Sequence, residues 1–396
     1  ALLAPGQPRN WDTSTMAKIA ELIEAKAARN EVFISYEYFP PRSEQGVANL
    51  KARFDRMRDF AKPLFCDITW GAGGSTSSLT LELTLEMKRV GLEPNMHLTC
   101  TNVAKADVVH ALETCRKAGV RNIVALRGDP PMGAVKWEAS DASFTCALDL
   151  VKFIRAEHGD YFNVSVAGYP EGHPDAIAPT DRALEALSPG ERARCRIGDA
   201  GEVLVCDDAA FDAELAYLKA KVDAGADVII TQMFFDVATY AAFVDAARAR
   251  GITVPIVPGI MVLQSAAGFK KMTGFCKTRV PDDVKRGVDA VAGDDAALKA
   301  FGIDLGVDMC RRLQAVGAPG LHFYTLNLEK STLAIIDKLG LADAAAAADD
   351  ARAPKTNGAT PNGARASSAL PSLTTVAAVA ALVAAVFFTV RSHARS

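Results

Sequence analysis

The sequence predicts an α/β protein built as a (β/α)8 TIM-type barrel with an extra N-terminal helix and a C-terminal tail. Eight short apolar runs alternate with amphipathic stretches between residues 31 and 341. Several of these stretches end in a glycine just before the next apolar run, as helix C-caps do. Polar side chains follow many of the runs, and the carboxyl ends of barrel strands form the active-site face.

Composition narrows the class of protein. A length of 396 residues suffices for one large barrel with decoration or for two domains, and the net charge of −3 gives no indication of a nucleic-acid partner. The eight cysteines are scattered, without a Cys-x-x-Cys pair or a Cys/His cluster. They favour a reducing compartment and argue against a zinc site or a disulfide framework. We therefore expect a cytoplasmic catalytic part, no nucleic-acid partner and no metal.

The chain is expected to begin with an arm and helix in residues 1–30, followed by the barrel in residues 31–341. Met16, Ile19, Ile23 and Ala27 have helical spacing and predict a helix over residues 13–29. The expected strands are residues 32–39, 64–69, 95–99, 122–126, 163–167, 228–232, 255–258 and 321–326. The helices between them include residues 76–90, 104–118, 145–158, 212–224 and 238–250.

Two regions fit the barrel pattern less regularly. The seventh strand is short, and two helical stretches are expected in residues 264–316 before the eighth strand. Residues 176–208 form a polar, proline- and charge-rich insertion between the fifth strand and its helix. An insertion of this length is interpreted either as a lid over the site or as tolerated surface.

The first strand carries a carboxylate that needs an explanation. Residues 33–41 read Phe-Ile-Ser-Tyr-Glu-Tyr-Phe-Pro-Pro, a strand ended by two prolines that cannot continue a ladder. Ser35, Glu37 and Phe39 share one face because side chains alternate along a strand. Glu37 is either a strand-end residue turned to solvent or a desolvated acid with a raised pKa, suited to holding a proton near neutral pH.

Other predicted strands also end in polar residues. These residues are Thr69, His97, Thr99, Arg127, Asp129, Tyr169, Gln232 and Tyr324. Together with Glu37 they would place carboxyl groups, an amide and an imidazole around one mouth. The glycine-rich segment 71–76 lacks the third glycine of a dinucleotide fingerprint, so it predicts a turn with Ser75 or Thr76 as helix N-cap.

The composition changes after residue 341. Residues 342–372 are of low complexity and predict a disordered linker. Residues 373–390 are eighteen residues without charge. A helix there would be about 27 Å long, just enough to cross a bilayer core. This tail is interpreted either as a membrane anchor for a cytoplasmic catalytic part or as an alanine-rich tail that stays in water.

An ordered set of motifs resembles one known family over roughly residues 30–340. The motifs are Glu37 in Tyr-Glu-Tyr-Phe-Pro-Pro, His97-Leu-Thr-Cys, Ala125-Leu-Arg-Gly-Asp-Pro, Ala167-Gly-Tyr-Pro-Glu, Ile230-Thr-Gln and His322-Phe-Tyr-Thr-Leu-Asn. They resemble methylenetetrahydrofolate reductase. The resemblance implies a barrel that holds FAD non-covalently and reduces 5,10-methylenetetrahydrofolate to 5-methyltetrahydrofolate with NADH or NADPH. We also expect a homo-oligomer.

The resemblance implies roles for individual residues. Glu37 matches the general acid, Asp129 the carboxylate between flavin and pterin, and Gln232 and Tyr324 match folate contacts. The implied cofactor contacts are Thr69, Trp70, His97, Arg127, Gly128, Asp129, Cys146, Ala147, Tyr169, His173, Ala176, Glu214 and Lys221. Chemistry supports the first role, since opening the methylene bridge requires a proton on the departing nitrogen, and a glutamate of ordinary pKa is ionised at neutral pH.

The chain departs from the family pattern in three places. Met261 and Ala266 stand where a proline and an aromatic residue are common, and Leu328 replaces an arginine. We expect no C-terminal regulatory domain and no S-adenosylmethionine inhibition through one. Two rival functions remain: a membrane-anchored flavin- or folate-binding protein that has lost turnover, and a pterin-dependent methyltransferase without flavin.

Overall fold

The computed structural model describes residues 16–70, 77–100, 103–128, 144–198 and 200–343. Several predictions concern residues outside these ranges. They are the role of Asp129, the turn at residues 71–76, nearly all of the linker at 342–372 and the candidate anchor at 373–390.

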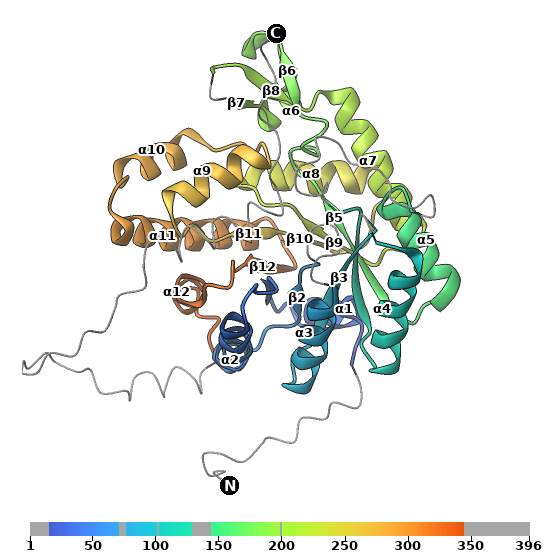
Figure 1. Ribbon diagram of the computed structural model, residues 1–396. Helices are drawn as coiled ribbons and strands as arrows, with labels where there is room; N and C mark the ends of the chain where they lie inside the picture. The colour runs from blue at the N-terminus through green and yellow to red at the C-terminus, as the bar shows by residue number, and fades with distance from the viewer. Residues whose placement is uncertain (1–15, 71–76, 101–102, 129–143, 199, 344–396) are drawn as a thin grey trace, which may run out of the picture.

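The predicted (β/α)8 barrel is confirmed (Figure 1). Its strands, in chain order, are β1 (Phe33–Tyr38), β2 (Cys66–Ile68), β3 (Pro94–Thr99), β4 (Asn122–Leu126), β5 (Asn163–Gly168), β9 (Val228–Thr231), β10 (Ile256–Val257), β11 (Gly259–Met261) and β12 (Gly320–Tyr324). All neighbouring strands are parallel, in the order β10-β9-β5-β4-β3-β2-β1-β12-β11.

The short seventh strand is divided at Pro258. Its first half, β10, pairs with β9, and its second half, β11, pairs with β12. Proline has no N–H to donate to a ladder, although its carbonyl still accepts a hydrogen bond from the His322 N–H at 3.1 Å. The two edge strands of the sheet, β10 and β11, are therefore the two halves of the seventh barrel strand. Together they connect β9 to β12 and close the barrel.

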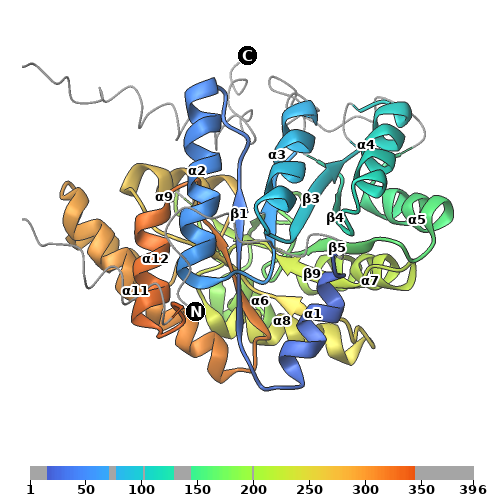
Figure 2. The ribbon, with the colours of Figure 1, turned by 90° about the horizontal axis from the view of Figure 1, so that it is seen from below.

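Helices surround the strands (Figures 1 and 2). They are α2 (Glu44–Ala61), α3 (Ser77–Arg89), α4 (Lys105–Lys117), α5 (Ala147–His158), α7 (Asp208–Asp223), α8 (Val237–Ala249), α9 (Ala266–Phe275), α10 (Asp282–Ala290), α11 (Asp295–Ala315) and α12 (Glu329–Lys338). Between β11 and β12 the structure has three helices, so the prediction of two was wrong. Asp294 separates α10 from α11. Its carboxylate caps α11 by accepting hydrogen bonds from the N–H groups of Ala296 and Ala297.

Helix α1 (Ile19–Ala27) closes the N-terminal end of the barrel, and Figure 2 shows it beside the strands. Ile19 and Ile23 pack among apolar residues at the starts of the strands. Asparagines of the barrel cap the helix, since the Ile19 N–H donates to Asn122 Oδ1 at 2.8 Å and the Ala20 N–H donates to Asn163 Oδ1 at 3.0 Å. This arrangement leaves the opposite end, where the strands finish, for the site.

The insertion after β5 folds into regular structure of its own. It contains β6 (Ala178–Thr180), a 3-10 turn η2 (Leu184–Ala186), α6 (Pro189–Arg194), β7 (Arg196–Ile197) and β8 (Val203–Val205). The strands form a small antiparallel sheet in the order β6-β8-β7, which lies beside α7 and α8 in Figure 1. None of its described residues lines the cavity discussed below, so the structure lends no support to the lid interpretation.

Within the part of the chain that the structure describes, no helix combines the length and apolar character needed to cross a membrane.

Candidate active site

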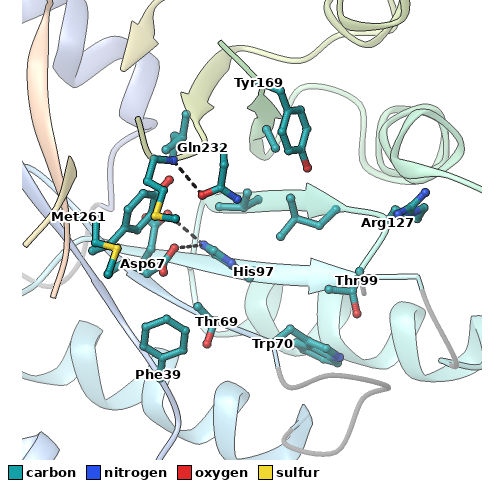
Figure 3. A pocket seen from close by; sticks show the side chains of 18 of the residues that line it. Phe39, Asp67, Thr69, Trp70, His97, Thr99, Arg127, Tyr169, Gln232 and Met261 are labelled. Carbon is teal, nitrogen blue, oxygen red and sulfur yellow. Dashed lines mark hydrogen bonds and ion pairs between the residues drawn. The ribbon is translucent and has the colours of Figure 1, made fainter. Parts of the chain in front are cut away.

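A cavity of about 220 Å³ lies at the carboxyl ends of the barrel strands. It brings together most of the residues that the sequence analysis singled out (Figure 3). Those residues are Glu37, Thr69, Trp70, His97, Thr99, Arg127, Gly128, Tyr169, His173, Gln232 and Tyr324. They come from seven different barrel strands or the loops that follow them, which is why no local motif predicts the cavity.

Glu37, on β1, is a buried acid. Its exposed fraction is 7%, which decides against the solvent-facing interpretation. Burial raises the pKa of Glu37 to about 7, while His97 opposes this rise and Asp67 adds to it. The predicted alternation is confirmed, because Glu37 and Phe39 line the cavity and Ser35 Oγ lies 2.9 Å from His322 Nδ1 in the barrel interior. Glu37 can therefore hold a proton near neutral pH.

Asp67, on β2, is the partner that the sequence analysis missed. It lies opposite Glu37 in the parallel register and is completely buried. Its Oδ1 accepts from Asn95 Nδ2 at 2.9 Å, and its Oδ2 lies 3.1 Å from His97 Nε2, a contact drawn as a dashed line in Figure 3. The same His97 nitrogen is 3.6 Å from Glu37 Oε2. Two carboxyl groups thus face one imidazole.

The pKa values of the two histidines beside this acid pair shift in opposite directions. Burial lowers the pKa of His97, but its hydrogen bond to Asp67 and the charge of Glu37 raise it more, so the net shift is upward. Burial lowers the pKa of His322 to about 4, with Asp67 opposing, so His322 is neutral at pH 7. The His322 ring stacks on Phe65, with centroids 5.7 Å apart.

The same three groups are close enough to bind a cation. One ligand atom each from Glu37, Asp67 and His97 lies within 4.8 Å of the other two. No metal is expected from the sequence, and this stays a prediction. His97 Nε2 already forms a hydrogen bond with Asp67, and a metal would have to displace it.

On the substrate side of the predicted site, Gln232 and Tyr324 approach one another through the backbone of β9. The Tyr324 hydroxyl donates to the carbonyl oxygen of Thr231, next to Gln232, and both side chains line the cavity. Phe39, which the strand alternation predicted beside Glu37, forms an apolar wall with Met233 and Met272, and these two methionines were not predicted.

The structure also locates the three residues that depart from the family pattern. Met261 lines the cavity. Ala266 is the first residue of α9, and Leu328 is the N-cap residue of α12, with 39% of its surface exposed. Neither Ala266 nor Leu328 is among the described residues that line the cavity.

Five predicted cofactor contacts lie outside the immediate lining of the cavity: Cys146, Ala147, Ala176, Glu214 and Lys221. Cys146 is the N-cap residue of α5 and Ala147 its first residue. The Ala176 N–H donates to the His173 carbonyl at 2.8 Å, next to the cavity.

Lys221, on α7, reaches toward the cavity from behind β5. Its Nζ donates to the carbonyl oxygen of Ala167 at 2.9 Å, and Ala167 lines the cavity. Burial lowers the pKa of Lys221 to about 8, with Glu214 opposing. Lys221 and Arg127 are side chains that suit a phosphate-bearing ligand, although Arg127 also forms an ion pair with Asp175 at 3.3 Å.

Two polar atoms of the cavity wall are buried without a hydrogen-bond partner among the described residues: Trp70 Nε1 and Thr99 Oγ1. An unpaired buried polar group costs about 1–3 kcal/mol, so such groups are rare unless a ligand pairs with them. Their presence fits a wall that pairs with the polar atoms of a ligand.

Comparison with known proteins agrees with this geometry. Residues 22–340 match the family model described as methylenetetrahydrofolate reductase. Methylenetetrahydrofolate reductase (NADH) 1 of Zea mays is 47% identical over 325 residues, which cover 82% of this chain and 51% of that protein. The 5,10-methylenetetrahydrofolate reductase of Pectobacterium carotovorum is 33% identical over 314 residues, covering 79% of this chain and 92% of that protein.

The chain thus spans about half the length of its plant relative and nearly all of its bacterial one. The match runs through every strand of the barrel, because residues 22–340 contain β1 to β12. By this measure the chain belongs to the methylenetetrahydrofolate reductase family.

Proposed function

We propose that this protein reduces 5,10-methylenetetrahydrofolate to 5-methyltetrahydrofolate, with FAD as cofactor and NADH or NADPH as electron donor. The observation that carries the proposal is Glu37, a buried carboxyl group with a pKa raised to about 7, in a cavity lined by residues of the family's motifs.

Glu37 is proposed to be the proton donor. The methylene group of the substrate bridges two nitrogens, and breaking one carbon–nitrogen bond leaves negative charge on the departing nitrogen unless a proton arrives. A glutamate of ordinary pKa, about 4.3, would carry almost no proton at pH 7. Burial in the barrel raises the pKa of Glu37 to about 7, so a proton is available on Glu37 to pass to that nitrogen.

The remaining described residues are proposed to bind and orient. Gln232 and Tyr324 would hold the folate, and Phe39 offers an aromatic face in the same cavity, whereas Ala266 provides none. Asp129, which lies outside the described residues, is proposed to stand between folate and flavin.

The cofactor is proposed to contact Thr69, Trp70, His97, Arg127, Gly128, Tyr169 and His173, with Lys221 and Arg127 facing its phosphates. The unpaired Trp70 Nε1 and Thr99 Oγ1 support this placement. A bound flavin would supply the hydride. Cys146, Ala147, Ala176 and Glu214 are proposed to complete the site around it.

The electron donor stays open between two nucleotides. The Zea mays relative is named as an NADH enzyme and the Caenorhabditis elegans relative as a probable NADPH enzyme. We further propose a cytoplasmic catalytic part, which the scattered cysteines favour, and a homo-oligomer.

The experiment is an anaerobic titration of the purified protein with NADH, NADPH and methylenetetrahydrofolate in turn, followed by flavin absorbance. We expect one nucleotide to bleach the flavin and the folate to restore its colour. A colourless protein that binds folate would favour the methyltransferase, and a flavin that is reduced but never reoxidised by folate would favour the binding protein without turnover.

The pH dependence of the folate half-reaction tests the proton donor. Because Glu37 must be protonated to act, the rate of flavin reoxidation by folate should be maximal below its pKa and fall tenfold per pH unit above about 7. Flavin reduction by the nucleotide requires no such proton and should lack this limb. Rapid-mixing measurements of each half-reaction across the pH range check the prediction, and a folate rate that rises through pH 7 would contradict it.

The tail carries a separate proposal, resting on the uncharged stretch 373–390 alone. If it anchors the protein, deleting residues 369–396 should release the protein from membranes with full activity in the soluble fraction. The measurement is fractionation of cells expressing the full and shortened chains. Recovery of the full chain entirely in the soluble fraction would remove the anchor from consideration.

A further inference from the structure

Two carboxyl groups compete for one imidazole N–H in the candidate site. His97 Nε2 lies 3.1 Å from Asp67 Oδ2 and 3.6 Å from Glu37 Oε2. The first distance is that of a hydrogen bond and the second is too long for one. His97 Nε2 therefore pairs with Asp67, and Glu37 receives no donor from it.

The packing explains why Asp67 holds the imidazole. Asp67 is completely buried, and Asn95 Nδ2 donates to its other oxygen at 2.9 Å, which fixes the plane of the carboxylate. Asn95 and His97 lie two residues apart on β3, so their side chains point to the same face and both reach Asp67. The three side chains form a preset unit beside Glu37.

We propose that Asp67 is a positioning residue for the proton donor: by pairing with His97 Nε2, it keeps that nitrogen from donating a hydrogen bond to Glu37 and leaves the Glu37 carboxyl group free to carry a proton to the substrate. This inference rests on the proposed function. It assigns a role to a residue that matches none of the implied cofactor or folate contacts.

The other described groups around Glu37 do not supply this effect. From β12, His322 is neutral at pH 7, and burial raises the pKa of Tyr324, so its hydroxyl is neutral as well. From β2, the Cys66 thiol has a pKa well above its usual value because of burial. In the described part of the chain, Asp67 and His97 are the groups whose electrostatic interactions shift the pKa of Glu37.

Replacing Asp67 by asparagine should lower the pKa of Glu37 for two reasons. The loss of the Asp67 carboxylate removes a negative charge that disfavours ionisation of Glu37. His97 also loses its stronger partner, so Glu37 becomes the only carboxylate of this group within its reach. Both effects favour the ionised form of Glu37 and lower its pKa.

The test is the pH profile of flavin reoxidation by methylenetetrahydrofolate in the flavin-loaded Asp67→Asn protein, with Asp67→Ser as a second variant lacking the carboxylate. We expect the pH at which the rate begins to fall to be lower by about one unit in the variants than in the wild-type protein. At pH values above both midpoints the variants should therefore react about tenfold more slowly. Flavin reduction by the nucleotide should change far less.

Ser165→Ala is the matched control. Ser165 is also completely buried, on β5, and its Oγ accepts from Asn163 Nδ2 at 3.3 Å, away from Glu37, Asp67 and His97. Its folate profile should keep the wild-type midpoint, whereas a general loosening of the barrel interior would alter both proteins alike.

Three results would overturn the inference. They are an unshifted limb in the Asp67 variants, a limb shifted to higher pH, and failure of both variants to retain flavin, which would make the role of Asp67 structural. Absence of folate turnover in the wild-type protein would instead refute the proposed function itself, so the two failures are distinguishable.

Discussion

Replacing Glu37 by glutamine should slow flavin reoxidation by methylenetetrahydrofolate by a factor of about 10² to 10⁴, the usual contribution of a positioned general acid. Glutamine has nearly the same shape but no proton to give at neutral pH. Flavin reduction by the nucleotide should stay near the wild-type rate, because that half-reaction needs no proton on the folate nitrogen. Rapid-mixing measurements of the two half-reactions separate these outcomes.

Glu171→Gln is a matched control for this substitution. Glu171 is also a buried acid, with 6% of its surface exposed and a pKa that burial raises to about 8, but it is not among the described residues that line the cavity. The glutamine can still accept the hydrogen bond that the Arg279 N–H donates to the Glu171 side chain. Equal losses in both half-reactions of Glu37→Gln, or the same folate defect in Glu171→Gln, would contradict the assignment.

Replacing Gly259 by alanine should disturb the packing of β11 against β9 and β12, where the barrel closes. A Cβ at this position would lie 2.3 Å from the Thr231 carbonyl oxygen and 2.4 Å from the Tyr324 hydroxyl. The first atom belongs to the backbone of β9 and cannot move aside, so β11 must shift and Tyr324 must lose its place. We expect the free energy of unfolding to fall by about 1–3 kcal/mol or more and folate to bind more weakly.

Denaturant unfolding and the KM for folate measure these two effects. Gly274→Ala is the control, because a Cβ on Gly274 in α9 would meet no atom within 4 Å. Alanine is the better helix former, so this variant should unfold at the same or higher denaturant concentration. A Gly259→Ala protein as stable as wild type, with unchanged folate binding, would show that this packing tolerates a shift.

Much of the fold was predictable because strands and helices leave periodic signals. The alternation of Ser35, Glu37 and Phe39 predicted their common face, and the structure confirms it. The interruption of the seventh strand at Pro258 and the boundaries of α9, α10 and α11 were harder to predict. Such interruptions and helix ends depend on single residues, for example Asp294. The insertion contained no periodic run, so its small sheet was not predicted.

The candidate site was predictable only in part. Strand ends identified most of the polar residues that line the cavity, because all strands of a barrel end on one face. Asp67 was missed although it lies two residues before Thr69 and hence on the same face, a signal that was available. Its pairing with His97 was not available, since the contact joins side chains thirty residues apart.

The sequence by itself determined which chemical groups the protein has and on which faces of its strands they lie, because that information is local. Tertiary structure alone decided that the Glu37 carboxyl group is removed from water and that Asp67, not Glu37, holds His97. The physical reason is that the pKa of an acid depends on its distance from solvent and from other charges, and both are set by segments far apart in the chain.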